Sequence, residues 1–241
     1  ALGRDLWQLV SEGPAEAMNQ TVNTQPLMLT AGIAAYRLWL SRGGPQPAIV
    51  AGHSLGEYSA LVAAGAIEFA DAVPLVELRA RAMQEAVPAG TGAMAAILGL
   101  DAATVRGICA EVAQGQIVEA VNLNAPEQTV IAGHTAAVQR AADTCKARGA
   151  KRALLLPVSA PFHCSLMLPA AEKLCARLAT LNVVAPKILL LNNVDVASPQ
   201  DPAAIKDALV RQAAAPVRWV ETMQAMAAQG VTHVYECGPG K

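Results

Sequence analysis

The chain has 241 residues, 54% of them hydrophobic and 15% charged, with a formal net charge of -1. This composition excludes a disordered chain and is typical of a well-buried α/β protein, and the length suffices for one large domain or two small ones. The near-neutral charge, without a long basic run, argues against nucleic acid or a membrane as a partner.

Targeting and metal-binding patterns are also missing from the sequence. No apolar stretch approaches the roughly 18 residues that a membrane-spanning helix requires, and residues 1–5 lack the pattern of a signal peptide. The five cysteines form no CxxC pair and the four histidines lack metal-ligand spacing, so we expect a cytoplasmic protein with mostly structural thiols and no metal. Without an initiator Met, and ending at Gly238-Pro239-Gly240-Lys241, the chain is expected to be cut at both ends.

The first part of the chain alternates helical and strand patterns. Apolar residues recur at three- and four-residue intervals over residues 27–39, which predicts a helix that begins after Thr24-Gln25-Pro26. A short apolar run over residues 48–51 predicts a buried strand, and residues 57–64 predict the helix that follows it. A further helix is predicted over residues 72–85.

The pattern changes at Gly90. Strands are predicted over residues 92–100, 117–123, 129–132 and 152–156, with helices over 101–114, where Asp101 is the N-cap, and 135–148. This β-α-β-β-α-β order is the ferredoxin-like pattern. We therefore expect a small domain over residues 90–157, inserted into an α/β core formed by residues 1–89 and 158–241, with a cleft between them.

The last part of the chain returns to the α/β pattern. A helix is predicted over residues 166–181 and a strand over 188–191, and two more helices precede a final strand over 232–236. The predicted fold class is α/β, with an α/β-hydrolase-like core and an inserted ferredoxin-like small domain.

The sequence Gly52-His53-Ser54-Leu55-Gly56 lies between a predicted strand and the next helix. In this context G-x-S-x-G is the nucleophile elbow, a turn so tight that its flanking positions tolerate little side chain. The turn exposes the serine hydroxyl, and the helix start places backbone N–H groups near a developing oxyanion. We expect Ser54 to be a nucleophile and Leu55 N–H to be the first oxyanion donor; the alternative is an incidental Gly-rich turn.

A serine nucleophile needs a base, and four histidines compete for that role. The ring of His53 should point away from the neighbouring hydroxyl and pack or form a hydrogen bond. His134 is expected to be solvated in its turn, and His233 to be structural within its strand. His163 follows the small domain, where the chain returns to the cleft, so it is the favoured base; the alternative is a histidine that caps a helix.

No acidic residue between Ser54 and His163 has an obvious reason to orient the imidazole. The candidates all fall in the inserted domain, mostly on caps and exposed helix faces: Asp101, Glu111, Glu119, Glu127 and Asp143. A hydrolase triad would place an acid in this interval. The absence favours a Ser–His dyad, with a backbone carbonyl or an amide behind the imidazole.

Arg79 shares a helical stripe with Leu75, Ala82 and Met83. An arginine on an apolar stripe either extends its charged end to the surface or meets an anion, and a carboxylate is the best-matched anion. From the residues alone, the extended position at the surface is the better expectation.

Together these residues resemble the malonyl-CoA:acyl carrier protein transacylase family of fatty-acid synthesis. The motifs that carry the likeness run through nearly the whole chain: Thr24-Gln25-Pro26, Gly52-His53-Ser54-Leu55-Gly56-Glu57-Tyr58, Arg79, Gly90-Thr91-Gly92-Ala93-Met94, Asn122-Leu123-Asn124, Phe162-His163 and Gly238-Pro239-Gly240. The resemblance implies a malonyl transfer from malonyl-CoA to the phosphopantetheine thiol of acyl carrier protein. It implies no metal, no cofactor, no nucleic acid and no membrane.

The resemblance also assigns roles to residues of the chain. It implies that Ser54 holds the malonyl ester, and that His163 is the base and then the acid, steadied by the main chain near Gln212. It implies that Arg79 binds the free malonyl carboxylate, which reverses the expectation from the residues alone. The residues implied to line the cleft are Gln25, Met94, Asn122, Asn124 and Phe162, and a Phe at the last position looks like the family's choice for malonyl.

The sequence departs from the family at its start. Family members begin with a Gly-Gln-Gly-rich segment whose glutamine donates the second oxyanion N–H, and this chain starts after it. Loss of one such donor costs roughly 2.7–4 kcal/mol of transition-state stabilisation. Two alternatives therefore stay open: a serine hydrolase or thioesterase that uses the same elbow, and a catalytically impaired binding fragment.

Docking of the carrier protein is not decided by the sequence. Four basic residues cluster near the end of the small domain: Lys146, Arg148, Lys151 and Arg152. They fit a basic docking patch for an acidic carrier protein and, equally, a solvated helix end and turn.

Overall fold

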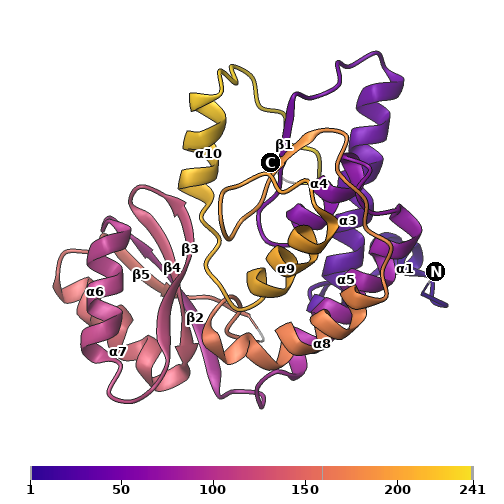
Figure 1. The fold of residues 1–241 in the computed structure, drawn as a ribbon. Coiled ribbons are helices and arrows are strands. Elements are labelled where there is room, and N and C mark those ends of the chain that lie inside the picture. Colours follow the sequence, from indigo (N-terminus) through magenta and orange to yellow (C-terminus); the bar gives the residue numbers. More distant parts are fainter. Residues whose placement is uncertain (1, 159, 240–241) are drawn as a thin grey trace.

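Two separate sheets organise this mixed α/β chain, of which the computed structural model describes residues 2–158 and 160–239 (Figure 1). Ala1, Ser159, Gly240 and Lys241 lie outside the described residues, and with them the last glycine of the Gly238-Pro239-Gly240 motif. Within the described part, no helix has the length and apolar character needed to cross a membrane.

The smaller sheet pairs β1 with β6 in parallel, with Ile49 opposite Leu189. Helices surround this pair and bury a large apolar cluster that includes Leu29, Leu61 and Leu174. The elements of this part are α1 (Leu6–Glu12), α2 (Ala15–Met18), α3 (Thr21–Ser41), β1 (Ile49–Ala51), α4 (Gly56–Ala63), α5 (Phe69–Glu85), the 3-10 turn η1 (Ser165–Met167), α8 (Leu168–Ala179), β6 (Leu189–Leu191), α9 (Pro202–Gln212) and α10 (Trp219–Ala228).

The larger sheet is antiparallel, and its four strands lie in the order β3-β4-β2-β5. Its elements follow one another along the chain as β2 (Gly92–Leu98), α6 (Ala102–Val112), β3 (Val118–Ala125), β4 (Gln128–His134), α7 (Thr135–Ala147) and β5 (Arg152–Leu155). Both helices lie on one side of the sheet (Figure 1). The side chain of Asp101 accepts a hydrogen bond from Thr104 N, as expected of the N-cap of α6.

The two faces of this sheet bury different partners. Alternate residues of a strand point to opposite faces, and Ile97 and Ile131 pack with the helices α6 and α7. Met94 and Val130 face the other way and cluster with Cys164, one residue after His163. Backbone bonds also tie the sheet to the core, since Leu123 N donates to Val217 O at 3.0 Å. The sheet therefore packs against the segment around His163 and is hydrogen-bonded to the segment that follows Gln212.

Two helices begin earlier than predicted, and both contain a proline. α3 starts at Thr21, with Pro26 inside it, and α5 starts at Phe69, with Pro74 inside it. A proline removes the N–H that would bond the carbonyl four residues earlier. In α3 that carbonyl belongs to Val22, and Arg4 Nη2 donates to it instead at 3.1 Å. This substitute bond from outside the helix is not visible in the local sequence.

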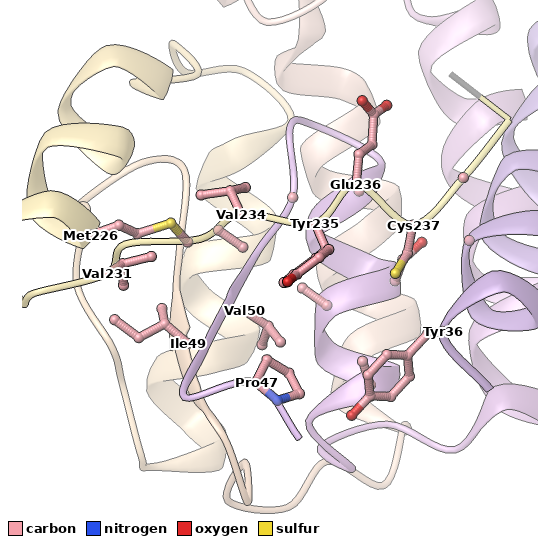
Figure 2. A pocket seen from close by; sticks show the side chains of 18 of the residues that line it. Tyr36, Pro47, Ile49, Val50, Met226, Val231, Val234, Tyr235, Glu236 and Cys237 are labelled. Carbon is pink, nitrogen blue, oxygen red and sulfur yellow. The ribbon is translucent and has the colours of Figure 1, made fainter. Parts of the chain in front are cut away.

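The strand predicted over residues 232–236 is wrong. The segment follows α10 without regular secondary structure, and Val234 and Tyr235 are exposed. A β-strand requires a neighbour that takes its backbone hydrogen bonds. The neighbouring strand β1 pairs with β6 in the described part of the chain, and a cavity separates β1 from residues 231–237 (Figure 2).

Candidate active site

The serine turn lies between β1 and α4, where the parallel pair ends. Ser54 has a positive φ of 54°, a conformation that non-glycine residues rarely adopt and that is concentrated at functional sites. A Cβ on Gly52 would lie 1.9 Å from the backbone carbon of Gly56, so only glycine fits there. A Cβ on Gly56 would meet nothing within 4 Å, so the predicted intolerance is wrong at that position. Gly52 approaches the backbone of Gly56, whereas a side chain on Gly56 would point into open space.

Ser54 and His163, which are far apart in sequence, are in hydrogen-bond contact. Ser54 Oγ lies 2.6 Å from His163 Nε2, and His163 Nδ1 lies 2.9 Å from the main-chain oxygen of Gln212. A carbonyl oxygen can only accept, so Nδ1 carries the proton and Nε2 is free to accept from the serine. His163 also has a positive φ, 66°. The partner behind the imidazole is thus a backbone carbonyl and not a carboxylate.

The environment of His163 favours the neutral imidazole. The side chain is 3% exposed, and burial, followed by the nearby charge of Arg79, lowers its pKa to about 3. Both causes disfavour a positive charge on the ring. At neutral pH the imidazole is therefore unprotonated at Nε2 and can take a proton from Ser54.

Arg79 is buried, so the expectation of an arginine extended to the surface is wrong. The side chain is 2% exposed, with Nη2 donating to Ser54 Oγ at 3.0 Å and to Gln212 Oε1 at 3.1 Å. Nη1 donates to Gln25 Oε1 at 2.8 Å. The guanidinium carbon also lies 5.3 Å from the ring centre of Tyr58. Polar groups around the serine hold the arginine inside, which helical periodicity alone does not reveal.

Two polar residues of β3 differ in their contacts. Asn124 Oδ1 lies 2.8 Å from His53 Nε2, and the His53 ring meets Trp219 edge-on at 5.6 Å between centroids. The expectation that His53 turns away from the serine into packing and a hydrogen bond is therefore confirmed. The side-chain oxygen of Asn122 is buried without a hydrogen-bond partner in the described structure.

Met94 and Phe162 lie in apolar surroundings beside the His163 segment. Met94 is 3% exposed, and Phe162 packs against both the core cluster and the cluster that contains Met94. Phe162 also lines a cavity of about 510 Å³ next to the first turn of α3, together with Thr21 and Thr24. Phe162 therefore directly precedes His163 in the chain and borders an open space.

The two remaining histidines differ from their predicted roles. His134 Nδ1 accepts a hydrogen bond from Ile117 N at 2.9 Å, so this half-buried histidine ties the end of β4 to the residue before β3 and is not simply solvated. His233 is exposed in a segment without regular structure, and its Nδ1 lies 2.9 Å from Thr232 Oγ1. It is not a structural strand residue because the predicted strand does not form.

The basic cluster is partly neutralised by its neighbours. Arg148 forms an ion pair with Glu111 at 2.7 Å, and Lys151 forms one with Glu127 at 3.1 Å. All five cysteines are free, and no group of three or more potential metal-ligating side chains was found among the described residues.

Sequence reasoning missed Asn193 and Glu57. Asn193 Oδ1 accepts from Ser54 N at 2.7 Å, and its Nδ2 donates to Gly52 O at 2.8 Å, so it fixes both sides of the elbow. Asn193 follows β6, which is parallel to β1, and such strands end at the same edge of a sheet. Glu57 is the single charged residue of α4 and is 1% exposed. Two features of the sequence could have indicated these residues: the position of Asn193 just after a predicted strand, and the single charge of Glu57 on an otherwise uncharged helix.

A larger cavity of about 950 Å³ lies behind the elbow, between β1, α3 and residues 229–238. Figure 2 shows Ile49, Val50 and Tyr36 among the residues around it, with Val234 and Tyr235 on the chain that crosses it. His53 and Leu55 line this cavity, whereas Ser54 does not. The cavity and the Ser54–His163 pair therefore lie on different sides of the same turn.

Known proteins share this sequence and this arrangement. The acyl transferase domain family matches residues 1–239. The malonyl CoA-acyl carrier protein transacylase of Escherichia coli K12 is 60% identical over 241 residues, which are all of this chain and 78% of that protein. An acyl-carrier-protein S-malonyltransferase from Burkholderia pseudomallei is similar with a TM-score of 0.97 and 64% identity, over 99% of this chain and 78% of that one.

A further solved structure holds a carrier protein. A malonyl-transacylase in complex with its type II PKS acyl-carrier protein is similar with a TM-score of 0.98 and 56% identity, over 99% of this chain and 77% of that one.

Proposed function

The chain belongs to the acyl transferase domain family, and we propose that Ser54 and His163 carry out the malonyl transfer for which its relatives are named. The reaction moves a malonyl group from malonyl-CoA to acyl carrier protein in fatty-acid synthesis. The observation that carries the assignment of roles is the 2.6 Å contact between Ser54 Oγ and His163 Nε2.

The first half-reaction loads the serine. Ser54 Oγ attacks the thioester carbonyl carbon of malonyl-CoA while His163 Nε2 takes the hydroxyl proton. The tetrahedral intermediate then collapses, the C–S bond breaks, and His163 returns its proton to the departing sulfur. The products are free CoA and a malonyl ester on Ser54.

The second half-reaction reverses these roles. The phosphopantetheine thiol of the carrier protein gives its proton to His163 and attacks the ester carbonyl. The C–Oγ bond breaks, and His163 returns the proton to Ser54 Oγ. Neither half consumes a proton overall, so the imidazole needs only to shuttle it, and we propose that the reaction uses no metal and no cofactor.

Two further roles follow from the surroundings of Ser54. The amides of Gly56 and Glu57 already donate to carbonyls within the turn, and we assign the Leu55 N–H to the oxyanion. We assign Arg79 to the free carboxylate of the malonyl group, and the 3.0 Å distance from its Nη2 to Ser54 Oγ supports this role. Gln25, which accepts from Arg79, orients that guanidinium.

The cleft residues extend this assignment. We propose that Phe162, Met94, Asn122 and Asn124 line the space for the acyl group and its carrier. The unpartnered oxygen of Asn122 and the position of Phe162 beside His163 support this role.

The finer architecture is part of the same proposal. We assign residues 90–157 to a ferredoxin-like small domain, and residues 1–89 and 158–241 to an α/β-hydrolase-like core. The β3-β4-β2-β5 antiparallel order with two helices on one face supports the first assignment. The strand-serine turn-helix arrangement supports the second. We place the reaction in the cytoplasm.

A serine hydrolase would use the same elbow but pass the acyl group to water. Incubation of the protein with malonyl-CoA, with and without holo acyl carrier protein, separates the two. We expect rapid appearance of malonyl carrier protein and slow release of free malonate. Release of malonate at the same rate with and without the carrier, and without malonyl carrier protein, would instead identify a thioesterase.

A further inference from the structure

A buried carboxyl group lies behind the elbow and has no part in the proton transfers described above. Glu57, on α4, is 1% exposed. Its Oε2 accepts two hydrogen bonds, from Gln212 Nε2 at 2.8 Å and from Asn193 N at 2.9 Å. The donors come from different parts of the chain, the end of α9 and the second residue after β6. Glu57 thus joins three separate parts of the chain beneath the serine.

Gln212 connects this carboxyl group to every reacting residue. Its Nε2 also donates to Ser54 O at 3.0 Å, and its Oε1 accepts from Arg79 Nη2 at 3.1 Å. Its main-chain oxygen accepts from His163 Nδ1 at 2.9 Å. A movement of Gln212 would therefore displace the base, the arginine and the nucleophile together.

The orientation of the Gln212 amide depends on its two neighbours. An amide has a donating end and an accepting end, and either can face a given partner. Here a carboxylate oxygen takes the NH₂ end and a guanidinium holds the oxygen end, so the reversed orientation would set like groups against each other on both sides. Glu57 and Arg79 together thus select one orientation.

Glu57 also partly compensates the positive charge of the buried Arg79. The guanidinium is 2% exposed, and in the described part of the chain no carboxylate lies within 4.0 Å of it. A buried charge without compensation is unfavourable. Glu57 supplies the opposite charge through the intervening amide, and this attraction is felt by both groups.

We propose that Glu57 is a positioning residue of the acyl transfer, which holds the Gln212 carbonyl against His163 Nδ1 and the guanidinium of Arg79 beside Ser54. The proposal rests on the proposed function of the Ser54–His163 pair. In a Ser-His-acid triad the carboxylate binds the imidazole directly. Here the carboxylate acts one residue away, through Gln212, which accounts for a histidine base without an adjacent acid.

The buried carboxyl group of Glu57 should make the stability of the fold depend on pH. Burial raises the pKa of Glu57 to about 7, against an ordinary value of 4.5, while Gln212, Asn193 and Arg79 act to lower it and Asp195 to raise it. Tyr58, on the same helix, and Arg79, on α5, are the other ionisable groups beside it. Because the folded pKa is the higher one, the stabilisation is complete below pH 4.5 and is lost as the pH rises through 7. A carboxyl group at this position therefore costs stability at pH 8.

The test compares Glu57→Gln and Glu57→Asp with the wild type and with Glu68→Gln, an exposed carboxylate at the start of α5. Glutamine keeps the acceptor geometry without the charge, and aspartate keeps the charge but is one methylene short. Steady-state kcat and KM for malonyl transfer to holo acyl carrier protein, the single-turnover rate of Ser54 acylation and the melting temperature of each variant are measured at pH 8. We expect kcat to fall about 10- to 100-fold in both Glu57 variants, with KM changed less than about threefold.

Two further readouts distinguish positioning from folding. Glu57→Gln should melt no lower than the wild type at pH 8, and ¹⁵N NMR of labelled histidine should show that His163 no longer holds its proton only at Nδ1. Glu68→Gln should match the wild type throughout.

Wild-type acylation in both folded Glu57 variants, or a loss confined to KM, would overturn the positioning role while leaving the proposed function intact. If Glu57→Gln does not fold, wild-type kcat in Glu57→Asp overturns the role by itself. Absence of acylation in the wild-type protein would overturn both.

Discussion

The two sheets differ in what lies where their strands end. At the end of the β1–β6 pair, Ser54 has a positive φ and the buried polar side chain of Asn193 holds the turn. The four-stranded sheet is filled by apolar residues such as Ile97 and Ile131, which pack with two amphipathic helices. The turn at the end of the first sheet thus combines an unusual backbone conformation with buried polar side chains, whereas the helix-covered face of the second sheet is apolar.

This difference indicates that the two sheets have separate roles, one in the site and one in its support. The four-stranded sheet reaches the site through single polar contacts, such as Asn124 with His53 and Glu119 with Ser165, whose amide and hydroxyl it binds at 3.0 and 2.6 Å. Strain and buried polar groups are costly and persist where the surrounding structure holds them. The four-stranded sheet provides that support, and the end of the β1–β6 pair holds the residues to which we assign the chemistry.

Replacement of the base should produce the largest effect at the end of the β1–β6 pair. In His163→Ala the proton of Ser54 has no acceptor, so we expect acylation by malonyl-CoA to slow by at least about 10³-fold. Stopped-flow release of CoA measures this rate. A loss below tenfold would mean that another group is the catalytic base, and the contrast between the two regions would not hold.

Replacement of the buried arginine should change substrate choice. We expect Arg79→Ala to slow malonyl transfer by about 30- to 100-fold, since a charge-assisted bidentate contact is lost. Acetyl transfer should change much less, because the acetyl group has no carboxylate. Paired measurements with malonyl-CoA and acetyl-CoA test this, and equal losses on both would show that Arg79 does not read the carboxylate.

A core substitution in the four-stranded sheet should act on stability alone. Ile131 is fully buried on β4, and Ile131→Ala should lower the free energy of unfolding by about 2–5 kcal/mol through the lost contacts and the cavity left behind. Urea unfolding measures this change. Acylation per folded molecule should stay within about threefold of the wild type. A larger loss would mean that the sheet takes part in the chemistry more directly than through support.

The sequence predicted the region of the four-stranded sheet more completely than the end of the β1–β6 pair. Alternation and helical periodicity are local, and they located the six elements from β2 to β5 within a few residues. The G-x-S-x-G pattern located the serine turn for the same reason. The depth of Arg79 depends on partners 25 to 133 residues away, such as Ser54 and Gln212, and no local pattern records such contacts.

Other differences have the same origin. The start of α3 depends on a bond from Arg4 to the carbonyl that Pro26 leaves open. A strand at residues 232–236 would need a neighbour for its backbone. The buried position of Glu57 emerges only when α4, α9 and β6 come together. Each of these is a tertiary contact that outweighs the local preference.

The location of the acyl group tests the central claim most directly. The protein is mixed with labelled malonyl-CoA, quenched in acid within one turnover, digested and mapped by mass spectrometry, with Ser54→Ala as the control. We predict a single malonyl ester on Ser54, absent from the control and discharged when holo acyl carrier protein is added before the quench. A malonyl group on another residue, or one that persists in Ser54→Ala, would contradict the assignment of Ser54 and His163.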